Sequence, residues 1–263
     1  MKQFILVSQQ GRQYEVTIPN PQPDLVSAYI FAFARGGSTL LNNMVTSYCQ
    51  YIRVPTFSLF DTAFDQGVPT HGIQKDAAVC FNKTGCIYTG FRHFPAFDLD
   101  VSGAPVIWLV RDPRDMMVSL YYSVLKSHVI PKGLVSFTKN RKEAAKLDIN
   151  QYVIEKSKSF AGQFQRYQKM LEGSDLKIYR YEDVIYDKEK WLTDVVSKLG
   201  VERNQRHIKN IAKQFDVIPE TENENKHIRQ VHPGNHTRKL TNQTIQELNT
   251  LFSDFLKYFN YEH

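Results

Sequence analysis

A basic residue, two glycines and two hydroxyl residues stand together directly after an apolar stretch of the chain. They are Arg35, Gly36, Gly37, Ser38 and Thr39. Because glycine has no Cβ atom, a turn that contains it can bring several backbone N–H groups close to one anion. The arginine would add a positive charge, and the hydroxyl groups would add hydrogen-bond donors. This pattern indicates a site for a phosphate or sulfate group.

The neighbouring residues predict a strand before this turn and a helix after it. Residues 29–33 form a short apolar run, typical of a parallel strand buried on both faces, and we expect the strand to end near Ala34. Apolar residues recur at helical spacing after the turn, at Leu40, Leu41, Met44 and Val45. The start of a helix offers unpaired N–H groups and the positive end of its dipole to an anion. The bland alternative is a capped helix that binds no ligand.

The sequence does not contain the usual loop of ATP and GTP sites, G-x-x-x-x-G-K-[ST]. An ordinary nucleoside triphosphate site is therefore not expected at Arg35.

A second charged cluster follows another apolar run. Residues 106–110 predict a buried strand, Arg111 stands at its carboxyl end, and Pro113 suits the first turn of a helix that carries Ser119. Ligands of open α/β sheets gather at the carboxyl ends of the strands. Arg111 and Ser119 could therefore meet at one phosphate group. The alternative is a surface ion pair between Arg111 and Asp112 at a routine strand-to-helix turn.

Together these segments resemble the sulfotransferase family that uses 3'-phosphoadenosine 5'-phosphosulfate (PAPS). In that family a basic-x-Gly-Ser/Thr-Thr loop holds the 5'-phosphosulfate, and an R-[DN]-P-[KR]-D segment with a downstream serine holds the 3'-phosphate. Residues 35–39 resemble the first motif, with Arg35 where many cytosolic members have lysine and Gly36 where serine is usual. Residues 111–115 and Ser119 match the second motif. The resemblance implies that these residues bind the cofactor.

Two further stretches are similar to family motifs and stand in the expected order. Residues 178–183 look like the strand and Tyr-Glu-Asp segment whose tyrosine lies near the adenine, which implies this position for Tyr181. Residues 227–236 resemble the C-terminal R-K-G-x-x-G-x-W loop over the 3'-phosphate and keep Arg229 and Gly234. Three other positions of that loop differ from the family. The resemblance spans roughly residues 29–261 and implies that Tyr181, Arg229 and Gly234 bind the cofactor.

His93 is the candidate general base. The family often has K-x-H-x-P between its two phosphate motifs, and residues 91–95 read Phe-Arg-His-Phe-Pro. An imidazole with an ordinary pKa of about 6.5 can accept a hydroxyl proton near neutral pH. Phe91 takes the place of the lysine, so a positive group near the sulfuryl is missing unless Arg92 supplies it. His71 is the second candidate, and a purely structural role for His93 is the alternative.

The alternation of strands and helices predicts an α/β fold with a mostly parallel central sheet flanked by helices, and the resemblance implies the P-loop-like sulfotransferase architecture. We expect an N-terminal hairpin and linker at residues 1–23. A single sulfotransferase domain would follow at residues 24–263, with a possible helical cap at residues 126–169. Helices are expected at residues 148–171 and 242–258.

The 263 residues include 33 Lys and Arg and 27 Asp and Glu, a formal net charge of +6 that suits a polyanionic cofactor. Ten Lys or Arg and only three acidic residues lie between residues 126 and 169. This basic stretch is either a solvated helical face or a mobile cap facing the cofactor or an anionic acceptor. No nucleic-acid recognition motif accompanies the charge, so nucleic acid is not an expected partner.

The three cysteines are not spaced as metal ligands and suggest a reducing compartment. We expect neither a metal nor a transmembrane segment, and a cytoplasmic protein.

The sequence therefore predicts a PAPS-dependent sulfotransferase that transfers a sulfuryl group to a hydroxyl of a small molecule, lipid or carbohydrate. Arg35 would stabilise charge on the departing phosphate, and His93 would take the acceptor proton. A P-loop-type kinase and a non-catalytic nucleotide-binding module remain open, and so does the oligomeric state. Six phenylalanines either line an apolar acceptor pocket or belong to the core: Phe57, Phe60, Phe64, Phe91, Phe94 and Phe97.

Overall fold

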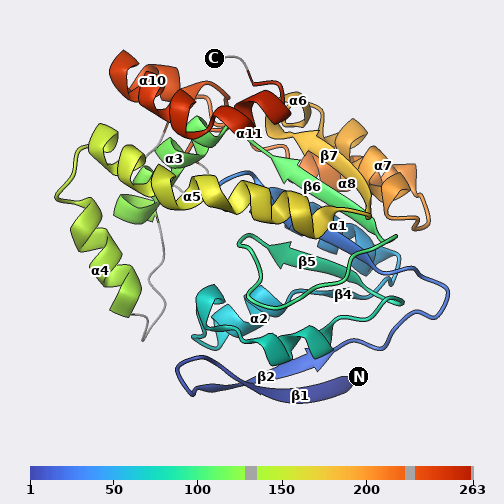
Figure 1. Ribbon diagram of the computed structural model, residues 1–263. Coiled ribbons are helices and arrows are strands. Elements are labelled where there is room, and N and C mark those ends of the chain that lie inside the picture. The colour runs from blue at the N-terminus through green and yellow to red at the C-terminus, as the bar shows by residue number, and fades with distance from the viewer. Residues whose placement is uncertain (128–134, 223–228, 262–263) are drawn as a thin grey trace.

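A parallel sheet of five strands forms the centre of the molecule (Figure 1). The computed structural model describes residues 1–127, 135–222 and 229–261. The strand order is β4-β5-β3-β6-β7, and all neighbouring pairs run parallel. Their bounds are Thr56–Phe57 (β4), Ile87–Phe91 (β5), Ala28–Ala32 (β3), Pro105–Val110 (β6) and Asp175–Arg180 (β7). The predicted fold class is confirmed.

Helices cover both faces of this sheet, and its central strands are therefore buried on both sides. In β3, Ile30 and Ala32 belong to one apolar cluster, while Tyr29 and Phe31 belong to the other. The first cluster is covered by α1 (Ser38–Tyr51), α7 (Lys188–Lys198) and α8 (Gln205–Gln214). The second is covered by α5 (Ile149–Leu171), α3 (Pro113–Tyr122), α10 (Asn242–Leu251) and α11 (Ser253–Tyr258), with α5 drawn in yellow across the sheet (Figure 1).

Shorter elements complete the fold. They are α2 (Leu59–Asp65), the 3₁₀ turns η1 (Thr70–Gly72) and η2 (Lys75–Cys80), the π-helical turn η3 (Ser123–Ser127), α4 (Val135–Ala144), α6 (Tyr181–Val184) and α9 (Asn235–Lys239).

The N-terminal hairpin forms as predicted, from β1 (Lys2–Val7) and β2 (Gln13–Ile18). Tyr14 and Val16 are buried in the same cluster as Phe31, so the hairpin shares the core of the sheet. The division of the chain at residue 23 stays a prediction. Of the predicted cap, residues 128–134 lie outside the described part, and the remainder contains the last two residues of η3, all of α4 and most of α5.

Two element boundaries differ from the sequence prediction. The strand expected to reach Ala34 ends at Ala32, because the carbonyl of Phe33 already accepts the N–H of Gly36 at 2.9 Å and starts the turn. The helix expected over residues 242–258 is divided at Phe252, whose ring packs at 5.9 Å from the ring of Phe160.

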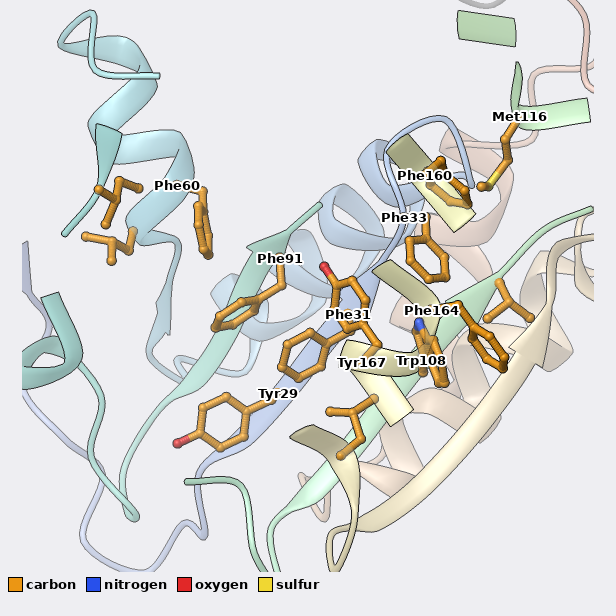
Figure 2. Packing of buried hydrophobic residues seen from close by; sticks show 14 of the residues in the cluster. Tyr29, Phe31, Phe33, Phe60, Phe91, Trp108, Met116, Phe160, Phe164 and Tyr167 are labelled. Carbon is orange, nitrogen blue, oxygen red and sulfur yellow. The ribbon is translucent and has the colours of Figure 1, made fainter. Parts of the chain in front are cut away.

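An aromatic core supports the end of β3 and fixes α5 beside it (Figure 2). The ring centroid of Phe33 lies 5.0 Å from those of Phe160 and Tyr167, and 5.7 Å from that of Trp108. Such ring pairs add attraction beyond the burial of apolar area. The turn that begins at Phe33 therefore starts from a rigid base.

Candidate active site

One cavity of about 960 Å³ opens at the carboxyl ends of the central strands. It is lined by residues that are far apart in the sequence, as expected for the ligand edge of a parallel sheet. The predicted site residues that line it are Arg35, Gly37, Ser38, Thr39, His93, Arg111, Ser119, Tyr181 and Arg229.

The turn after β3 needs glycine at residue 37. Gly37 caps the N-terminus of α1 with a φ of +95°, in the left-handed region. A Cβ atom at this position would lie 2.9 Å from Cδ2 of Tyr181. Arg35 adopts a φ of +68°, which is uncommon for a residue with a side chain. This turn leaves the first N–H groups of α1 beside the cavity.

Gly36 is predicted to bind the cofactor but does not line the cavity. A Cβ atom there would lie 3.0 Å from the carbonyl oxygen of Phe33, so the backbone at Gly36 is too closely packed for a larger residue to fit without a shift.

Arg35 binds the hydroxyl of Ser119 and lies near two other arginines. Its Nε and Nη2 atoms both donate to Ser119 Oγ at 3.2 Å. Burial, together with the charges of Arg111 and Arg229, lowers the pKa of Arg35 to about 10. The guanidinium stays positive at neutral pH. Three cationic groups thus meet in one cavity, an arrangement that an anionic ligand would stabilise.

Arg111 is buried and is held against an aromatic ring. Its Cζ atom lies 4.4 Å from the ring centroid of Tyr181, and its Nη2 lies 3.7 Å from the carboxylate of Asp115. Its buried Nε has no hydrogen-bond partner in the described part of the chain. A buried donor without a partner is costly. Arg111 is therefore suited to receive an oxyanion from the cavity.

Asp115 connects the helix after β6 to the C-terminal loop. Its fully buried carboxylate accepts the backbone N–H of Gly234 and of His236 at 2.8 Å, and also contacts His236 Nδ1 at 2.7 Å. Burial alone would raise the pKa of Asp115, but the hydrogen bond from His236 and the charge of Arg111 outweigh burial and lower it. Gly234 itself does not line the cavity, and its predicted cofactor contact stays a prediction.

Arg229 already has an anionic partner. Its guanidinium forms an ion pair with Glu222 and lies 4.4 Å from the ring centroid of Tyr122. Lys239 lies 3.2 Å from the same carboxylate. Burial tends to raise the pKa of Glu222, but the cations Lys239 and Arg229 together lower it. A phosphate that binds Arg229 would have to share it with Glu222.

His93 lies two residues beyond the end of β5 and lines the same cavity as Arg35. Its side chain is open to solvent through the cavity, while protein surrounds its other sides. This enclosure lowers the pKa of His93, and the nearby charges of Arg92 and His71 lower it further. The neutral, proton-accepting imidazole is thereby favoured. His71, the second candidate base, lines the cavity as well.

Arg92 lines the cavity but has a carboxylate partner. Its Nη1 lies 2.6 Å from Asp61 Oδ1, and the other oxygen of Asp61 accepts the hydroxyl of Ser58 at 2.6 Å. The charge of Arg92 is therefore balanced before any ligand binds. Whether Arg92 replaces the family lysine stays an open prediction.

Several lining residues were not singled out from the sequence. The apolar residues Ile185, Phe215 and Val217 line the cavity, as does Tyr181, whose hydroxyl donates to the carbonyl of Val231 at 3.0 Å. Lys188 also lines it and binds Asp216 Oδ1 at 2.6 Å. No motif of the sequence marks these residues.

The six phenylalanines divide into two groups. Phe60, Phe64 and Phe94 line the cavity, while Phe57, Phe91 and Phe97 are core residues that do not line it. The cavity thus has an apolar wall, but only three of the six phenylalanines contribute to it.

The family model described as the sulfotransferase domain matches residues 95–257, more than half of the chain. The chain belongs to this family. The predicted family is thereby confirmed. The match includes Arg111, Ser119, Tyr181 and Arg229 but begins after the Arg35 turn and His93.

Two solved structures resemble this sulfotransferase along most of their length. Mouse sulfotransferase SULT7A1 complexed with PAP is 12% identical, with a TM-score of 0.59 over 89% of this chain and 85% of that chain. Retinol dehydratase, in complex with androsterone and the inactive cofactor PAP, is 11% identical, with a TM-score of 0.50 over 95% of this chain and 88% of that chain. At such identities the likeness establishes the fold. Among curated proteins, none matches the sequence.

No described helix is both long and apolar enough to cross a membrane. Across residues 1–127, 135–222 and 229–261, no group of three or more His, Cys, Asp or Glu side chains could hold a metal ion.

Proposed function

We propose that this sulfotransferase transfers a sulfuryl group from PAPS to an acceptor hydroxyl, with His93 as the general base. One observation carries the proposal: a single cavity holds two arginine-bearing strand ends and a histidine whose neutral form is favoured. The arginines suit the two anionic ends of the donor, and the histidine suits the proton of the acceptor.

The cavity's donors fit a ligand with two separate phosphate groups. Arg35, Ser38, Thr39 and the first N–H groups of α1 would bind the 5'-phosphosulfate. Arg111, Ser119 and Arg229 would bind the 3'-phosphate. Ser119 Oγ accepts from Arg35, so its own hydroxyl hydrogen is left to donate. The unpartnered Nε of Arg111 supports this fit.

Apolar residues that line the same cavity as Tyr181 suit a flat base. Ile185, Phe215 and Val217 offer an apolar surface, and Tyr181 is held by Arg111 on one face. We propose that the adenine of PAPS lies among these side chains.

In the proposed transfer step, His93 acts on the acceptor and Arg35 acts on the departing phosphate. A bond forms between the acceptor oxygen and sulfur while the bond from sulfur to the phosphate oxygen breaks. His93 takes the proton of the acceptor hydroxyl. Arg35 and the N–H groups of α1 stabilise the negative charge that develops on the departing phosphate, and these preorganised donors should contribute more than the base. The proposal requires no metal.

The acceptor is proposed to be a hydroxyl of a small molecule, lipid or carbohydrate. The buried, unpaired thiols of Cys49, Cys80 and Cys86 support a reducing compartment, and we propose the cytoplasm.

Thermal stability in the presence of nucleotides tests the cofactor part of the proposal. Adenosine 3',5'-bisphosphate should raise the unfolding temperature far more than AMP or ATP, since only this ligand offers phosphates to both arginine clusters. Equal stabilisation by ATP with Mg²⁺ would favour the kinase alternative.

A screen with labelled PAPS tests the transfer itself. Hydroxyl acceptors of different classes should receive label in the presence of EDTA. Tight bisphosphate binding without transfer to any acceptor would favour the non-catalytic nucleotide-binding module.

A further inference from the structure

The cavity lining is cationic and, over residues 1–127, 135–222 and 229–261, contains no carboxylate. Its charged side chains are Arg35, Arg92, Arg111, Arg166, Lys188 and Arg229.

Most of these cations are already accounted for. Arg35, Arg111 and Arg229 are the groups proposed to bind the donor. Lys188 is paired with Asp216 at 2.6 Å, and Arg92 is paired with Asp61 at 2.6 Å. The remaining cation of the described lining is Arg166.

Arg166 projects from α5 onto the segment that carries the proposed base. Its Cζ atom lies 4.0 Å from the ring centroid of Phe94, the residue directly after His93. The next residue on α5, Tyr167, packs edge-on against the same ring, with centroids 5.4 Å apart. Tyr167 is fully buried, so α5 holds Arg166 against Phe94, the residue that follows His93 in the sequence.

Arg166 has no carboxylate partner within the described part of the chain. A guanidinium stacked on an aromatic ring keeps the N–H groups at its edge free to donate, and its planar fork matches a carboxylate. The group is therefore suited to bind an anion from the cavity.

The same cavity has an apolar wall. Phe60 and Phe64 project from α2 and line the cavity. The ring of Phe60 lies 5.2 Å from that of Phe91, at the end of β5 and two residues before His93 (Figure 2). An apolar wall, a basic histidine and an unpaired guanidinium thus lie at the end of β5.

From this arrangement we infer that the acceptor class is an aromatic or similarly apolar hydroxy acid. Its hydroxyl lies at His93, its carboxylate pairs with Arg166, and its apolar body packs on Phe60 and Phe64. The inference rests on the proposed function, because it assigns the acceptor of the same transfer reaction.

Matched pairs of acceptors test this inference. Hydroxyaryl carboxylates and their methyl esters present the same hydroxyl and differ only in charge. The native protein should use each acid better than its ester. Arg166→Gln should lower kcat/KM for the acids about tenfold, through KM, because an exposed charge-assisted contact is lost. The esters should be unaffected, and Arg166→Lys should restore part of the preference.

A control variant on the same helix separates the contact from a general charge effect. Lys169 is exposed on α5 and does not line the cavity. Lys169→Gln removes the same charge and should leave the preference for acids unchanged. An equal loss for acids and esters in Arg166→Gln would place Arg166 at the transferred sulfuryl group and overturn the inference. A native preference for esters would also overturn it.

A binding measurement distinguishes this inference from the proposed function. Calorimetry on the bisphosphate-saturated protein should detect the acid in the native protein and a weakened interaction in Arg166→Gln, without any turnover. Binding that depends on Arg166 without transfer from PAPS would refute the proposed function but support an acid site. Transfer to neutral acceptors with no dependence on Arg166 would support the function and overturn the acid site.

Discussion

Arg35 and Ser119 are joined by two hydrogen bonds, from Nε and Nη2 of the arginine to the hydroxyl oxygen of the serine, each 3.2 Å long. They stand 84 residues apart, one in the turn after β3 and the other in the helix after β6. The two anion-binding segments that the sequence predicts separately are therefore one structural unit. A substitution of either residue should therefore alter the contribution of the other to bisphosphate binding.

A double-mutant cycle measures this coupling. Arg35→Ala and Ser119→Ala should each weaken bisphosphate binding. The double variant should lose less than the sum, with a coupling energy of about 1 kcal/mol, since residues in direct contact are not additive. Calorimetric affinities of the four proteins provide the measurement. Additive losses would show that the contact has no part in binding.

The arginines proposed for the 3'-phosphate should act on binding. Arg111→Ala and Arg229→Ala are each expected to weaken bisphosphate affinity by about 2 kcal/mol, roughly thirtyfold, because a desolvated charge-assisted contact is lost. Arg35→Ala should reduce turnover beyond its loss of binding. Normal bisphosphate affinity of Arg229→Ala would mean that the C-terminal loop is misassigned.

Glu222 would compete with a 3'-phosphate proposed to bind Arg229. Replacing its carboxylate by an amide, Glu222→Gln, should free Arg229 and tighten bisphosphate binding several-fold. Glu220, an exposed neighbour outside the cavity lining, provides the control variant Glu220→Gln, which should bind as the native protein does. Weaker binding by Glu222→Gln would instead mean that the ion pair positions Arg229 for the phosphate.

The pH dependence of transfer should follow His93. In the proposed mechanism its neutral form accepts the proton, and burial together with the charges of Arg92 and His71 holds its pKa below the ordinary histidine value of about 6.5. Transfer should therefore be constant around neutral pH and fall only as the pH drops through this lowered pKa. The rate profile of a single turnover with saturating PAPS checks this expectation. A decline that already begins above neutrality would exclude the neutral His93 imidazole as the base.

Part of the site can be predicted from the sequence because the pattern that marks it, an apolar run followed directly by an arginine, is local. Arg35 and Arg111 both stand directly after apolar runs, and the carboxyl ends of neighbouring parallel strands meet at one edge of a sheet. Convergence of Arg35 and Arg111 could thus be predicted without knowing the rest of the fold. The family motif also marked Tyr181 and Arg229, which line the same cavity.

Other features depend on how distant elements pack. Arg166 lines the cavity because α5 packs against the core and against Phe94, and no spacing in the sequence reports those contacts. The motif predicts Gly234 beside the cofactor but does not report that its N–H donates to the buried carboxylate of Asp115. Partners of this kind are set by tertiary packing, which a linear pattern does not contain.

The most direct test of the central claim is single-turnover transfer from PAPS by His93→Gln, measured beside its bisphosphate affinity. The substitution keeps a polar side chain but removes the base. The rate is expected to be about a hundredfold to ten-thousandfold lower, with affinity for the bisphosphate nearly unchanged. His71→Gln serves as the matched control and should transfer at close to the native rate. Near-native transfer by a folded His93→Gln protein would contradict the assignment of His93 as the base.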